Sequence, residues 1–271
     1  MRIPLALVAG AVLSGGTVLR ASAGTPSTRD AAIKVVAQIR KADYEGDRTA
    51  LKRLHGELMP IPEDPAAASR VFYWKGFALW RRAINGFNEQ FDPKEQEDDL
   101  TNAIADFDAA GAKDSRFADA KIGKLSCLGL IGYLHMKEPD GFQKYAPPIR
   151  ALVAEIKVLD PDNPRFIWVN GQNVWNIPPE RGGGQDKAIE MYKTSLEAIR
   201  KKGKSADPLE PSWAEPELLM SLAYSYAYKN VPDVNLAEKY AVEALKLVPY
   251  WHYTRDILLV QIREMKEKKS P

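Results

Sequence analysis

The stretch Asn235–Pro249 reads NLAEKYAVEALKLVP, and it decides the fold class of this 271-residue chain. Small residues recur in it at Ala237, Ala241 and Ala244, which share one helix face because one turn takes 3.6 residues. Small side chains on one face let a second helix approach closely. Pro249 then ends the helix, because proline cannot donate the next backbone hydrogen bond. The stretch predicts one member of a tightly packed helix pair.

Two other stretches, LTNAIADFDAAG and QDKAIEMYKTSLEAI, carry the same ladder with a larger residue between two small ones. The ladder residues are Ala103, Phe107 and Ala110 in the first and Ala188, Tyr192 and Ser195 in the second. The segment before each ladder carries large and small residues that complement it. These are Trp74, Phe77 and Ala78; Gly171 and Val174; Leu222, Ala223 and Tyr226.

These paired patterns resemble the tetratricopeptide repeat (TPR) family, in which W-x2-L-G-x2-Y is followed by A-x3-F and a closing proline. The likeness is clear in three helix pairs. The ladders begin at Ala103, Ala188 and Ala237, 85 and 49 residues apart, whereas the standard period is about 34 residues. The resemblance therefore implies a divergent TPR-like solenoid; the alternative is a generic helical bundle with alanine-rich packing.

Apolar residues recur at helical spacing along the rest of the chain, and alternating strand-like runs are missing. We therefore expect an all-α protein of about five antiparallel hairpins and a C-terminal capping helix. Pro147 and Pro148 should break or kink the sixth helix. The expected helices span 28–43, 47–58, 64–87, 94–111, 115–136, 140–159, 164–176, 185–202, 212–229, 233–247 and 250–267.

The first 23 residues have the features of a secretory signal peptide. Arg2 precedes a mostly apolar run, and Ala21-Ser22-Ala23 fits the small-x-small cleavage rule. An uncleaved anchor is the alternative, but the run is shorter than the ~20 residues that a spanning helix needs. We expect cleavage near Ala23, a single TPR-like domain over 24–271 with no integral membrane span, and a periplasmic or secreted location.

Charge and composition exclude several functions. The net charge of +2 includes Arg2 and Arg20, so the chain after residue 23 is neutral and has no electrostatic footprint for nucleic acid. One cysteine, Cys127, and three scattered histidines give no metal or nucleophile motif. Cys127 lies in an apolar run and is interpreted as a buried thiol. We expect no enzyme activity, no cofactor and no metal.

A proline- and glycine-rich loop, PPERGGG, is the most distinctive local feature. Its structural residues are Pro178, Gly182, Gly183 and Gly184. With the preceding Asn-Pro-Arg helix start, it resembles a group of exported bacterial TPR-like proteins with a Pro-x3-Gly-Gly-Gly loop. It resembles the T-component proteins of TRAP transporters more weakly. We interpret the glycines as supplying positive φ for a chain reversal; phosphate binding is disfavoured because no Gly-Lys-Ser/Thr follows.

In a TPR solenoid the first helix of each pair lines a concave groove, where partners bind. The register of the small residues predicts a groove that mixes cationic and aromatic side chains, which are common interface anchors. The alternative is that the aromatic side chains belong to the core. The candidate groove residues are Lys75, Leu79, Arg82, Arg165, Trp168, Gln172, Trp175, Glu217 and Tyr224.

These patterns predict a binding or scaffold protein that contacts a protein or peptide of the cell envelope. Three cations in the groove, Lys75, Arg82 and Arg165, favour acidic partners. The alternative function is a small-solute or lipid-binding accessory of a transport system, with a small apolar ligand near Trp168, Trp175 and Tyr224. The YWHY stretch at Tyr250–Tyr253 is interpreted as a plug on the last hairpin; lining an aromatic pocket with the nearby tyrosines is the alternative.

Overall fold

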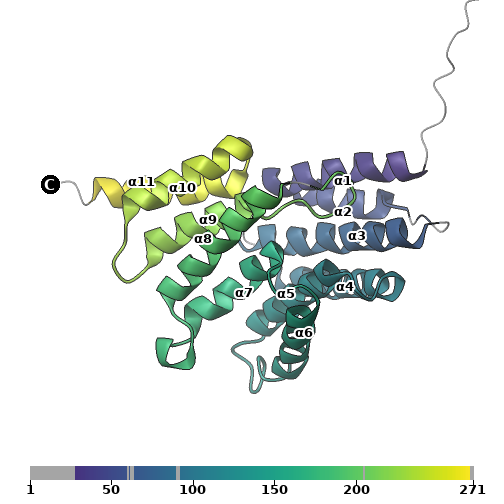
Figure 1. Ribbon diagram of the computed structural model, residues 1–271, viewed down its shortest axis with the longest axis horizontal. Helices are drawn as coiled ribbons and strands as arrows, with labels where there is room; N and C mark the ends of the chain where they lie inside the picture. Colours follow the sequence, from purple (N-terminus) through teal and green to yellow (C-terminus); the bar gives the residue numbers. More distant parts are fainter. Residues whose placement is uncertain (1–27, 60, 62–63, 90–91, 204, 269–271) are drawn as a thin grey trace, which may run out of the picture.

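The computed structural model describes residues 28–59, 61, 64–89, 92–203 and 205–268. The predicted signal peptide lies outside these residues. The described part folds into eleven α-helices and contains no strand, which confirms the all-α prediction (Figure 1). The helices are α1 Thr28–Glu45, α2 Arg48–Glu57, α3 Pro65–Gly86, α4 Pro93–Lys113, α5 Ala118–Leu134, α6 Ala146–Leu159, α7 Pro164–Asn176, α8 Gln185–Lys202, α9 Glu215–Tyr228, α10 Val234–Leu247 and α11 Leu259–Glu267.

Consecutive helices form five pairs, from α1–α2 to α9–α10, and α11 packs on α10. This arrangement matches the predicted solenoid of hairpins with a capping helix. The sixth helix begins only at Ala146, so Pro147 and Pro148 fall in its first turn, where a missing N–H costs little. A turn of π-helix, η2 Tyr253–Leu258, precedes α11. No described helix has the length and apolar character needed to cross a membrane.

Side-chain caps set several helix starts. The carboxylate of Asp47 accepts from the backbone N–H of Ala50, and Asp233 caps Leu236 in the same way. Such caps satisfy N–H groups that have no partner within the helix. Asn163 likewise caps α7, whose first residue is Pro164. Local sequence therefore determines where these helices begin.

The C-terminal core contains the ladder from which the fold class was predicted. Ala237, Ala241 and Ala244 of α10 are fully buried against α9. In the preceding pair, a Cβ at Gly171 would overlap the ring of Tyr192. Small residues therefore permit the close helix approach that the sequence predicted.

The N-terminal core is centred on α3 and is mainly aromatic. Tyr73, Trp74, Phe77 and Trp80 are buried on this single helix. Their rings contact one another edge-on or tilted, for example Trp74 and Phe77 with centroids 4.9 Å apart. Such geometries are favourable for aromatic pairs. Helix α3 is thus a central element with neighbours on several sides.

The connection between α8 and α9 (205–214) is a long loop that extends to the N-terminal helices rather than a short turn (Figure 1). Trp74 Nε1 donates a hydrogen bond of 2.7 Å to the Leu209 carbonyl oxygen. Trp213 Nε1 donates to the hydroxyl of Tyr73 at 2.8 Å. In a regular solenoid each repeat contacts only its neighbours. Here the connection joins the fourth and fifth pairs to the second.

A second closure joins the first and last helix pairs. The hydroxyl of Tyr44, near the end of α1, donates to Glu217 Oε1 of α9 at 2.8 Å. The Tyr44 ring also meets Trp251 edge-on, with centroids 5.0 Å apart. Trp251 is buried, so the YWHY stretch covers the last pair as predicted and also contacts the first. The first and last helix pairs are therefore in direct contact.

Candidate functional site

The three predicted groove residues of α3 do not face an open groove. Leu79 is buried in the N-terminal core. Lys75 Nζ donates to the His55 carbonyl oxygen at 2.8 Å, at the end of α2. Arg82 is buried and pairs with Asp99 and Glu95 of α4. The expected exposure is wrong for Leu79 and Arg82, because α2 and α4 cover this side of α3.

Glu217 of α9 is also fully buried, within an ionic cluster that the closure creates. Arg81 Nε donates to Asp43 Oδ1 at 2.8 Å, and Arg81 Nη2 lies 3.7 Å from Glu217 Oε1. Two carboxylates share one guanidinium, and burial raises the pKa of both Asp43 and Glu217. The predicted exposure of Glu217 is wrong, since α1 and α3 cover it.

On α7, the side chains of Arg165 and Trp168 contact other helices and the connection before α9. Arg165 forms an ion pair with the buried Asp119 of α5. Trp168 is half-buried, and its ring centroid lies 5.5 Å from that of Trp213 and 6.0 Å from that of Trp80. The interpretation of aromatic residues as core therefore fits Trp168. Trp168 therefore packs against the connection that carries Trp213 instead of facing an open groove.

Two of the predicted residues, Gln172 and Tyr224, are exposed, and both lie in the C-terminal half. Gln172 is exposed and Trp175 half-buried on α7, and Tyr224 of α9 is 40% exposed. Trp175 packs against the C-terminal core. Helix α7 contacts α9, so these residues belong to neighbouring elements. The accessible part of the predicted groove is limited to this region.

Tyr224 belongs to a group of three tyrosines, which we call the tyrosine face: Tyr224, Tyr228 and Tyr253. Tyr228 is 37% exposed, and its ring centroid lies 4.6 Å from that of Tyr224. Its hydroxyl donates to Gln261 Oε1 of α11 at 2.7 Å, which fixes the ring. Burial, with the two neighbouring phenols, raises the pKa of Tyr253 to about 12. The Tyr253 hydroxyl is therefore neutral at neutral pH.

The tyrosine face combines apolar rings with hydroxyl groups at an accessible position. Tyr and Trp contribute much of the binding energy at protein interfaces, because a rigid ring loses little entropy when it is covered. From the sequence, these tyrosines are the alternative wall of an aromatic pocket. Only Tyr224 is among the predicted groove residues, because the proximity of Tyr253 to Tyr224 and Tyr228 has no local sequence signal.

The glycine loop has the conformation that the sequence predicted. Gly182 and Gly184 have φ of 83° and 113°, in the region that favours glycine. A Cβ at Gly183 would overlap Ile177, so a third glycine is also required. Lys187 Nζ donates to the Gly182 carbonyl oxygen at 2.6 Å. The loop is a compact chain reversal between α7 and α8.

Cys127 is buried, as expected, and burial raises the pKa of its thiol well above the ordinary value. No group of three or more His, Cys, Asp or Glu side chains among the described residues could hold a metal ion. His55 and Asp106 form a pair at 2.8 Å.

Comparisons with known proteins find similar structures but no similar sequence family. No known family matches the sequence, and no curated protein does. The structure is similar to the HusA haemophore from Porphyromonas gingivalis, with a TM-score of 0.57 at 16% identity over 77% of this chain and 100% of that one. It is also similar to a thermophilic TPR protein from Thermus thermophilus, with a TM-score of 0.50 at 14% identity over 87% and 99%. The chain therefore has a TPR-like helical fold.

Proposed function

We propose that this protein is an exported, non-enzymatic scaffold that binds a protein partner of the cell envelope through the tyrosine face. The observation that carries the proposal is an accessible aromatic pair, Tyr224 and Tyr228, on the first helix of a TPR-like pair. Partners of such folds bind along these helices. A protein-binding helical scaffold is consistent with both structural neighbours, neither of which is described as an enzyme.

Export rests on the sequence of the first 23 residues. Expression of the full chain in a bacterium with two membranes should yield a periplasmic protein. Mass spectrometry should find a mature N-terminus at Gly24. Retention of Met1–Ala23 in the cytosolic fraction would contradict this part of the proposal.

The alternative, a small-solute or lipid-binding accessory, gains no supporting observation. The two hollows that we find among the described residues are open to solvent and have charged side chains on their rims. Neither contains Trp168, Trp175 or Tyr224. The first neighbour is described as a haemophore, but a likeness at 16% identity is evidence for the fold alone.

A pull-down from envelope extract tests partner binding. The bait is the chain 24–271, compared with its Tyr224→Ala/Tyr228→Ala variant. Tyr133→Ala is the matched control, because Tyr133 is an exposed tyrosine on a different helix, α5. We expect one protein to be captured by the wild type and the control but not by the double variant. Equal capture by all three folded proteins would exclude the tyrosine face.

A further inference from the structure

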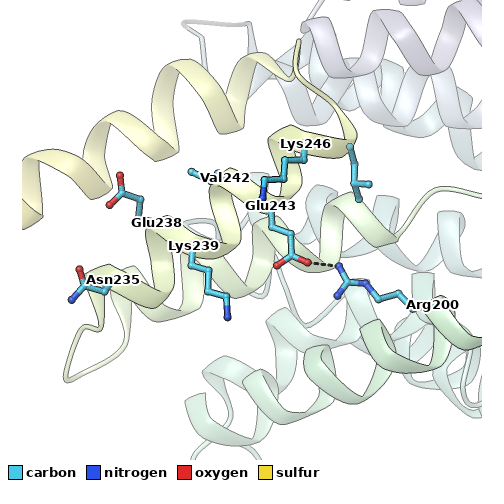
Figure 2. A pocket seen from close by; sticks show the side chains of 8 residues that line it. Arg200, Asn235, Glu238, Lys239, Val242, Glu243 and Lys246 are labelled. Atoms are coloured by element: carbon cyan, nitrogen blue, oxygen red, sulfur yellow. Dashed lines mark hydrogen bonds and ion pairs between the residues drawn. The ribbon is translucent and has the colours of Figure 1, made fainter.

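A second surface, on α10, has a different chemistry from the tyrosine face. An open hollow of about 620 Å³ runs along this helix beside the end of α8 (Figure 2). Seven of its lining residues come from α10 and share its outward side. We call it the α10 trough; it is lined by Arg200, Asn235, Glu238, Lys239, Val242, Glu243, Lys246 and Leu247.

The two carboxylates of the trough are already paired. Glu243 accepts from Arg200 Nη2 at 2.6 Å, as Figure 2 shows. Glu238 accepts from Arg263 at 3.1 Å and from Lys266 at 2.7 Å. These donors lower the pKa of Glu238, so it stays ionised and occupied. Each carboxylate of the trough therefore already has a cationic partner outside the lysines of α10.

Lys239 and Lys246 differ from these residues. Both are exposed, and neither forms a hydrogen bond or ion pair with any other residue that the structure describes. They lie seven residues apart, which places them on one side of the helix about 10 Å apart. Val242 lies between them, and Leu247, 47% exposed, follows them. The trough thus has two available cations separated by apolar surface.

We propose that the α10 trough binds an acidic amphipathic helix of a partner protein. Two carboxylates placed two turns apart on that helix would reach Lys239 and Lys246, and an apolar residue between them would cover Val242. The lining from Asn235 to Leu247 extends about 18 Å, or more than three turns of a bound helix. Charge complementarity of this kind sets orientation and association rate.

A polyphosphate or an anionic bilayer fits the trough less well than a protein helix. Both present a dense array of negative charge. Glu238 and Glu243 stand among the lysines and would repel such an array. A helix can place its few carboxylates at the lysines alone. The mixed charge of the trough therefore selects a protein ligand.

The test uses a fluorescent alanine-based helical peptide of about fifteen residues. It carries two glutamates seven residues apart with leucines between them, and a second peptide has glutamines in place of the glutamates. Anisotropy titrations compare the chain 24–271 with Lys239→Glu/Lys246→Glu and with Lys157→Glu, a control for an exposed lysine on α6. We expect the double variant and the glutamine peptide each to weaken binding about tenfold or more.

Equal affinity of wild type and double variant, or no saturable binding by the folded wild type, would overturn the proposal. Stronger binding to phosphatidylserine vesicles than to the peptide, lost in the double variant, would assign the trough to a membrane surface instead. The Tyr224→Ala/Tyr228→Ala variant should bind the peptide normally, because Tyr224 and Tyr228 line neither hollow. Loss of partner binding at the tyrosine face is thereby distinguished from loss of peptide binding at the trough.

Discussion

The second and fifth helix pairs, α3–α4 and α9–α10, carry the same small-residue ladder but present different surfaces. Along α3, no residue between Ala67 and Gly86 is exposed. Along α9, Tyr224 and Tyr228 remain exposed. The difference follows from what packs on each helix, since α2 of the first pair and the connection 205–214 lie on α3. The repeat motif therefore determines how helices pair, while contacts from beyond each pair determine which faces stay accessible.

The largest expected effect comes from removing the closure over α3. Trp213 is buried and contacts Phe77, Trp80 and Trp168, and its indole N–H is bonded to Tyr73. Trp213→Ala should lower the free energy of unfolding by about 3–5 kcal/mol, because it leaves a large cavity and an unpaired hydroxyl. Urea denaturation measures this loss.

Trp175→Ala is the matched comparison in the C-terminal half. Trp175 is half-buried, so its truncation removes less apolar area from the core and should cost less than about 2 kcal/mol. A loss for Trp213→Ala no greater than that for Trp175→Ala would show that the connection does not stabilise the N-terminal half.

A smaller effect tests whether close helix packing depends on a glycine facing an aromatic ring in both halves. A Cβ at Gly123 would overlap the ring of Phe107, and a Cβ at Gly171 would overlap that of Tyr192. Alanine at either position should destabilise the protein by about 1–3 kcal/mol through overpacking. A Cβ at Gly129 would meet open space, and this residue lies within α5. Gly129→Ala should therefore stabilise the protein by up to about 1 kcal/mol. Thermal denaturation of the three variants checks the order; stabilisation by Gly171→Ala would contradict the packing described for α7–α8.

The helices and their pairing could be predicted from the sequence because both depend on local signals. The ladder at Ala237, Ala241 and Ala244 and the caps at Asp47 and Asn163 act within a few residues of the helices that they define. Periodicity of this kind identifies the buried face of a helix against its partner. The predicted boundaries agree closely with the helices, with two exceptions: α6 begins only at Ala146, and α11 begins at Leu259, after the π-helical turn η2, rather than at residue 250.

The candidate site was less predictable, because burial of the first helices depends on contacts between distant residues. Nothing near Glu217 in the sequence indicates that Tyr44 and Arg81 cover it. The acidic stretch at Glu95–Asp99 is typical of a solvated helix start, yet Asp99 is buried where it pairs with Arg82. A periodic stripe therefore identifies a face, whereas its exposure depends on which other segments fold onto it.

The smallest effect that we predict concerns the buried ionic cluster at the junction of the two halves. The folded-state pKa of Glu217 is raised by burial, although Arg81 opposes the shift, so folding favours its protonated form. A group with a raised pKa contributes stability below its unfolded pKa, near 4.3. This contribution is lost as the pH rises from the unfolded pKa through the folded-state pKa. Over this range the folded state binds more protons than the unfolded state, so raising the pH disfavours folding.

Glu217→Gln isolates this contribution, because glutamine resembles the protonated acid: its carbonyl oxygen can accept from the backbone N–H of Ala214 and its amide group can donate to the Tyr44 hydroxyl oxygen. The wild type should be most stable relative to the variant at about pH 4, and its advantage should shrink as the pH is raised toward 8. Urea titrations at several pH values measure the difference, which we expect to be about 1 kcal/mol at its largest. Lys157→Gln, far from the cluster, is the control. An advantage that grows with pH would mean that Arg81 outweighs burial at Glu217, and the junction would then be held by an intact ion pair.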